Sequence, residues 1–60
     1  MMTISNNGYG GYEMSRGGDS RQIVRDSDGT YKLLLNLDSL VPIFESIDLE
    51  EVIDYVIDEL

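Results

Sequence analysis

The 60-residue chain contains no cysteine, no histidine and no tryptophan, and it has a single proline. Without cysteine it can form no disulfide, and without cysteine or histidine it lacks both preferred ligands of a structural zinc ion. The usual nucleophile–base pairs of covalent catalysis are missing for the same reason. Because a chain this short buries only about 60% of the surface that its unfolded form exposes, a partner or a second copy is the remaining source of extra stability.

Long hydrophobic runs are absent as well. No stretch approaches the roughly 20 apolar residues that a membrane span requires. A secretory signal needs a basic start followed by about 7–15 apolar residues, whereas Met1–Ser5 is followed at once by Asn6 and Asn7. We therefore expect no membrane contact, and a soluble protein of the cytoplasm, or of the host cytoplasm if the source is viral.

Basic residues are scarce and lie only in the first 32 residues, where four bases are balanced by four carboxylates. The last 28 residues contain no base, so the whole formal charge of −8 resides there. The carboxylates of this half are Asp38, Glu45, Asp48, Glu50, Glu51, Asp54, Asp58 and Glu59. A surface of one sign repels nucleic acid and attracts basic proteins. The sequence thus predicts a basic, nucleic-acid-binding protein as the partner, and no direct contact with nucleic acid.

Two apolar runs predict a β-hairpin in the middle of the chain. Residues 20–25 and 30–36 are rich in strand-forming side chains, and the segment between them, Asp26-Ser27-Asp28-Gly29, ends in the Asp-Gly pair that favours hairpin turns. A further strand is predicted over residues 11–16, which alternate apolar and polar positions and precede a Gly-Gly pair. The prediction is a small antiparallel sheet of two to three strands with its hairpin turn at 26–29.

The residues before this sheet, 1–11, are rich in Gly, Asn and Tyr and carry no charged side chain. We interpret them as an arm, either flexible or forming an edge strand, and residues 12–60 as one small domain. Tyr9 and Tyr12 are candidate interface residues, because tyrosine is enriched at protein interfaces.

From Asp38 onward the hydrophobic period changes. Asp38 and Ser39 can cap a short helical turn over residues 40–46, with Pro42 in its first turn, where its missing N–H is harmless. A longer helix is predicted over 49–60, because its apolar residues recur at the helical spacing of three and four. These residues are Leu49, Val52, Ile53, Val56, Ile57 and Leu60.

The predicted helix has a clear beginning and an apolar side that must be covered. Asp48 and Glu51 match a capping box at its start. We predict an α+β fold in which the apolar stripe packs on one face of the sheet. Leu60, at the end of this stripe, is a third candidate interface residue, since part of the stripe can also pack against a second copy.

Acidic residues occupy the opposite side of the same helix. At 100° per residue, Glu50, Glu51, Asp54 and Asp58 share an arc of roughly 100°, with Glu59 further round. Like charges four residues apart cost a few tenths of a kcal/mol for each pair. Two interpretations stay open: a solvated face that maintains solubility, or a face that a basic partner neutralises. The predicted partner-binding residues are Glu50, Glu51, Asp54, Asp58 and Glu59, with Asp38, Glu45 and Asp48 as a second cluster.

No metal, cofactor or reaction is indicated. If Gly29 were the sixth residue of a calcium loop, its first and twelfth would be Val24 and Leu35, and neither can bind the ion. A chain of 60 residues also has little room for a catalytic cleft of roughly 300 Å³. We therefore expect no enzymatic activity.

In its length, acidity, lack of cysteine and expected α+β class, the chain is similar to the small proteins that phages use against host nucleases, DNA-repair enzymes or CRISPR effectors. This similarity is one of composition, and no motif identifies a particular family. It implies a protein-binding inhibitor of the anti-CRISPR or nuclease-inhibitor type, which mimics nucleic acid and blocks a basic groove. The alternative is a structural or assembly subunit that self-associates, as a homodimer, through the helix stripe or the Tyr/Gly arm.

Overall fold

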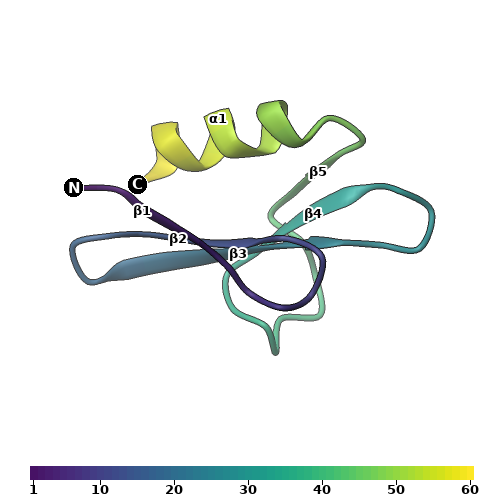
Figure 1. The fold of residues 1–60 in the computed structure, drawn as a ribbon, viewed down its shortest axis with the longest axis horizontal. Coiled ribbons are helices and arrows are strands. Elements are labelled where there is room, and N and C mark those ends of the chain that lie inside the picture. Colours follow the sequence, from purple (N-terminus) through teal and green to yellow (C-terminus); the bar gives the residue numbers. More distant parts are fainter.

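A meander of five antiparallel strands carries one helix on one of its faces in the computed structural model, which describes residues 1–60 (Figure 1). Strand order in the sheet follows chain order from β1 to β5. The α+β prediction is therefore confirmed, with five strands in place of two to three. The elements are β1 Thr3–Asn6, β2 Tyr12–Arg16, β3 Asp19–Arg25, β4 Tyr31–Leu34, β5 Phe44–Ser46 and α1 Leu49–Glu59.

The core lies between α1 and the central strands of the sheet. Alternation along the strands places one residue each from β2, β3 and β4 on the helix side, and α1 contributes two valines. These five residues are fully buried: Met14, Ile23, Leu33, Val52 and Val56. Burying each such side chain stabilises the fold by about 1.5–3 kcal/mol relative to leaving it exposed. The predicted helix and its packing on the sheet are confirmed.

The loop between β1 and β2 is tied to the neighbouring strand β3. The Asn7 side-chain amide donates to the Gln22 side chain at 3.2 Å and to the backbone oxygen of Ile23 at 3.0 Å. Gln22 is buried, and its own amide donates to Glu13 at 2.7 Å. A buried amide needs such partners, so this network holds the loop against the sheet. Thr3–Asn6 accordingly form an edge strand, β1, paired with β2.

The hairpin between β3 and β4 turns where the Asp-Gly pair predicts. The Asp26 N–H donates to the Thr30 oxygen at 2.8 Å, and the Gly29 N–H donates to the Asp26 oxygen at 3.0 Å. Gly29 has φ of +89°, a conformation that glycine adopts without steric strain.

The predicted helical turn over residues 40–46 is wrong. Phe44–Ser46 form β5, which pairs with the free edge of β4, and the Ile43 N–H donates to the Leu33 oxygen at 2.7 Å. The Asp38-Ser39 signal instead belongs to a turn organised by Asn36, whose side-chain oxygen accepts from the Asp38 N–H at 2.9 Å. Asn side chains make such local turns readily, so the capping signal did not start a helix.

α1 begins at its predicted cap but without the full capping box. The Asp48 side chain accepts from the Glu50 N–H at 3.0 Å. The Asp48 N–H donates to the Ser46 hydroxyl at 3.0 Å, so Glu51 does not reach back as the box requires. Ser46 has taken over that bond, and the Glu51 carboxylate is left without a partner.

A glycine at close backbone approach generates a stability prediction. A Cβ at Gly11 would lie 1.8 Å from the backbone oxygen of Ile23, whereas a Cβ at Gly18 meets nothing within 4 Å. We expect Gly11→Ala to lower the free energy of unfolding by about 3 kcal/mol or more, because the chain at Gly11 and β3 must separate to admit the methyl group. Gly18→Ala is the matched control and should stay within about 0.5 kcal/mol of the wild type. Urea unfolding followed by circular dichroism measures both, and equal stability of the two variants would contradict the close approach of Gly11 to β3.

Candidate acidic binding face

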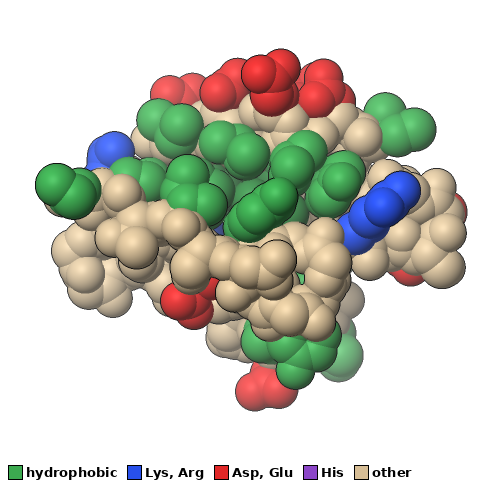
Figure 2. Space-filling view, viewed as in Figure 1, with side chains coloured by type: hydrophobic (Ala, Val, Ile, Leu, Met, Phe, Trp, Pro, Cys, Tyr) green, Lys and Arg blue, Asp and Glu red, His purple; other side chains and the backbone are tan.

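The side of α1 that points away from the sheet carries four exposed carboxylates, Glu50, Glu51, Asp54 and Asp58, which we call the acidic face. None of the four side chains takes part in a hydrogen bond or an ion pair. Figure 2 shows a row of acidic side chains along the outer side of the helix, with apolar side chains beneath it. The buried valines on the opposite side of α1 fix this orientation, so the acidic face is a rigid surface.

The mean charge density along the acidic face is close to that of one nucleic-acid strand. Glu50, Asp54 and Asp58 follow one another at intervals of four residues, or about 6 Å along the helix axis. With Glu51, the acidic face places four charges along a rise of about 12 Å, or one for about every 4 Å. One strand of a duplex carries a phosphate for about every 3.4 Å of its axis. The linear charge density therefore matches one strand rather than both.

Glu59 is separated from the acidic face and is paired within the chain. Its carboxylate accepts from the Arg21 guanidinium at 2.5 Å, and the side chains of Arg21 and Glu59 are only 18% and 26% exposed. Around the helix axis Glu59 lies about 20° from the buried Val52, which directs it toward β3. This pair joins α1 to the sheet.

The predicted second cluster is not assembled. Asp48 caps α1 and extends the acidic face at its start. Glu45 lies on β5 opposite Lys32, on the sheet face away from α1. Asp38 is exposed in the loop between β4 and β5, which lies across the sheet from α1 in Figure 1. Only Asp48 of these three is close enough in the fold to act with the acidic face.

The three candidate interface residues are also dispersed. Tyr9 is exposed in the loop between β1 and β2, whereas Tyr12 is half-buried at the start of β2. Leu60 is half-buried and packs against the core. Only part of the Leu60 side chain is therefore left for a contact with another molecule.

Tyr55 is a site residue that the sequence analysis missed. Its ring stacks on Phe44 of β5, with ring centroids 4.5 Å apart and planes 9° apart, yet it remains 38% exposed. A shallow depression of about 290 Å³ is lined by Tyr55, Asp58 and Glu59. The helical wheel contains the signal, because Tyr55 lies about 40° from Glu51. An aromatic ring therefore borders the acidic face.

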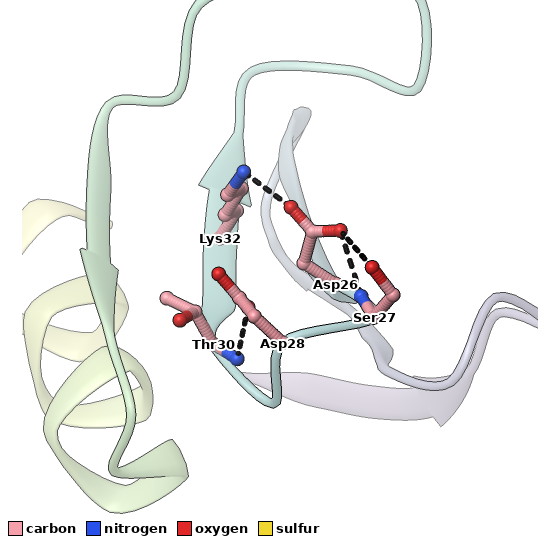
Figure 3. A network of polar contacts seen from close by, with 5 residues as sticks. All are labelled: Asp26, Ser27, Asp28, Thr30 and Lys32. Carbon is pink, nitrogen blue, oxygen red and sulfur yellow. Dashed lines mark hydrogen bonds and ion pairs between the residues drawn. The ribbon is translucent and has the colours of Figure 1, made fainter.

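Lys32, one of the four bases, is occupied at the hairpin turn. Around the hairpin turn, Lys32 pairs with Asp26 at 2.5 Å, and Asp28 accepts from the Thr30 N–H at 2.8 Å (Figure 3). The hydrogen bond from Lys32 lowers the pKa of Asp26 and raises the pKa of Lys32. The Thr30 N–H likewise lowers the pKa of Asp28. These contacts lie at the β3–β4 turn, so they do nothing to neutralise the acidic face.

The other two bases, Arg16 and Arg25, form no ion pair with the acidic face. The Arg25 guanidinium lies over the Tyr31 ring at 5.9 Å, and Arg16 is exposed at the end of β2.

No group of three or more carboxylates converges as a metal site would require. α1 is too short and too polar to cross a membrane. Comparisons with protein-family models, with characterised proteins and with solved structures gave no match.

The turn network generates a prediction about pH. Because the pKa values of Asp26 and Asp28 are lowered in the fold, their contribution to stability is complete above the ordinary carboxyl pKa of about 4 and is lost as pH falls through the lowered values. Lys32, whose pKa is raised, contributes below its ordinary pKa of about 10.4, and this contribution is lost as pH rises through the raised value. As pH is lowered from 7 to about 2.5, the urea midpoint should therefore fall more steeply for the wild type than for Asp26→Asn, which retains the acidic face unchanged. Parallel curves would exclude this role for the turn.

The position of Glu59 generates a second prediction. We expect Glu59→Gln to lower the free energy of unfolding by about 0.5–1 kcal/mol, because it removes a partly buried pair between α1 and β3. Asp58→Asn is the neighbouring control. It removes an unpaired charge at the negative end of the helix, so stability should stay level or rise by about 0.3 kcal/mol. Denaturation at low salt distinguishes the two, and equal effects would mean that Glu59 is as free as Asp58.

Proposed function

We propose that the chain is a non-enzymatic inhibitor that binds the basic groove of a nucleic-acid-handling protein through its acidic face. The observation that carries the proposal is the arrangement of Glu50, Glu51, Asp54 and Asp58 as unpaired, exposed carboxylates on one rigid helix. No base lies in the last turn of that helix, although a base there would stabilise it. A groove lined by Lys and Arg supplies the missing counter-charge.

The energetics favour such a partner. Glu50 and Asp54, and again Asp54 and Asp58, repel each other by a few tenths of a kcal/mol in the free chain. A basic groove relieves this repulsion and adds charge-assisted hydrogen bonds, which for Arg are frequently bidentate. Long-range attraction also accelerates the encounter, and it weakens as salt screens the charges.

The spacing of the charges suggests which part of the target is blocked. Because the acidic face matches the charge density of one strand, it suits a channel that holds a single strand or one backbone of a duplex. Tyr55 at its border can receive a guanidinium over its ring, as aromatic side chains commonly do. We place the protein in the cytoplasm, or in the host cytoplasm if it is viral. The composition it shares with phage inhibitors of nucleases and CRISPR effectors supports this class of target.

The proposal is tested with the tagged chain as bait in a cytoplasmic lysate, followed by titration of the captured protein in purified form. We expect a basic nucleic-acid-binding protein that single-stranded DNA displaces and whose affinity falls with salt. Glu50→Lys combined with Asp54→Lys should weaken binding by at least about tenfold.

The matched control is Asp19→Lys combined with Asp38→Lys, which changes the net charge equally at two exposed sites outside α1. It should retain most of the affinity. Equal losses of affinity in both double variants would mean that net charge, and not the position of the carboxylates, determines binding. Unchanged binding by the α1 variant would exclude the acidic face as the contact.

A further inference from the structure

The outer edge of β1 is an unprotected sheet edge. All four residues of β1 are exposed, and β1 pairs only with β2. Natural edge strands usually carry charged residues or proline, which discourage pairing with other chains. Here Met1–Tyr12 contain neither. The edge therefore presents unpaired N–H and C=O groups with nothing to repel a second strand.

An apolar border adjoins this edge. The stack of Tyr55 on Phe44 places one flank of α1 over β5, so the other flank, with Ile53 and Ile57, is turned toward the β1 side of the sheet. Ile57 is 44% exposed, and Ile4 of β1 is 51% exposed. Figure 2, viewed with β1 in front, shows apolar side chains along the molecule between the acidic row and the sheet. We call β1 and this border the apolar edge.

Charge decides what can cover the apolar edge. A basic partner finds no carboxylate on β1, whereas two copies of a chain with charge −8 repel each other through their acidic residues. Because residues 1–12 carry no charged side chain, this segment is where two copies can approach with least repulsion. A two-fold contact brings identical surfaces together, and identical strands meeting in this way are antiparallel. We propose that the chain forms a homodimer in which β1 pairs with β1 of a second copy and the two sheets become one.

The faces of the sheet restrict the register of this contact. Shifting an antiparallel pairing by one residue would turn the second copy's helix to the opposite face. Ile4 is the one apolar residue of β1 and lies on the helix side, opposite Met14. Centring the two-fold axis on Ile4 places it opposite its counterpart and Thr3 opposite Ser5, with both helices on the same face. An interface of about 1,000 Å² in total would cover about 500 Å² of each copy, which is about an eighth of the 3967 Å² that each chain exposes.

The dimer is independent of the acidic face, and salt distinguishes the two. Screening reduces the repulsion between two negative copies, so added salt should strengthen the dimer. The same salt should weaken the binding of a basic partner to the acidic face. Failure of one proposal therefore leaves the other standing.

The first test is the mass in solution. Sedimentation equilibrium of the wild type should give twice the 6.8 kDa of one chain. Ile4→Lys should raise the dissociation constant of the dimer by at least about tenfold, because it places two like charges face to face. The matched control is Ile47→Lys, which alters a more exposed isoleucine, at 79%, beyond the far strand β5. A monomeric wild type, or equal weakening by both variants, would overturn the proposal.

The second test uses the absence of native cysteine. Directly opposed residues in an antiparallel pair have Cβ atoms about 4.5–5.5 Å apart, close enough for a disulfide after a small adjustment. Ile4→Cys should therefore form a covalent dimer under mild oxidation much faster than Ile47→Cys. Equal rates for the two variants would exclude Ile4 from the two-fold axis, whether or not Ile4→Lys folds.

Discussion

The packing of two valines of α1 on the centre of the sheet is the contact on which the rest of the structure depends. Val52 and Val56 are fully buried against residues from β2, β3 and β4, and few other side chains are buried at all. Once these valines face inward, the helical period decides the rest of the helix surface. It turns Glu59 toward Arg21, holds Tyr55 over Phe44 and leaves the acidic face in solvent. A core this small leaves several surfaces uncovered, and among them are the acidic face and the apolar edge.

The carboxylates of the acidic face stay unpaired because the bases that form ion pairs make them elsewhere. All four bases are on or beside the sheet, and the two that form ion pairs do so at the far end of α1 and at the hairpin turn. Arg25 lies over the Tyr31 ring and forms no ion pair. Arg16 shares the helix side of β2 with Met14, yet it also forms no ion pair with α1. The acidic face therefore lacks a neutralising base because of how the chain folds, and not only because bases are few.

Sequence reasoning succeeded where the signals were local. The spacing of apolar residues in α1 and the Asp-Gly pair at the hairpin each depend on neighbours a few residues away, and both elements formed as predicted. β5 depends on a distant edge, because Phe44–Ser46 become a strand only when β4 offers its free hydrogen-bonding groups. β1 likewise lacks the alternation that would have marked Thr3–Asn6 as a strand. The pairing of Glu59 joins residues 38 positions apart, so no local pattern could have separated it from the acidic face.

The proposed dimer would give the acidic faces of two copies a geometrical relation that a single copy lacks. In the proposed dimer the two-fold axis passes through the joined β1 strands, so both helices lie on the same side of one sheet and run in opposite directions. Each acidic face has a mean charge density close to that of one nucleic-acid strand, and the strands of a duplex are also antiparallel. A single copy would therefore imitate one backbone, while the dimer would present two. Self-association through an uncharged edge is compatible with this role, because it brings two acidic helices onto one side of the sheet without burying either.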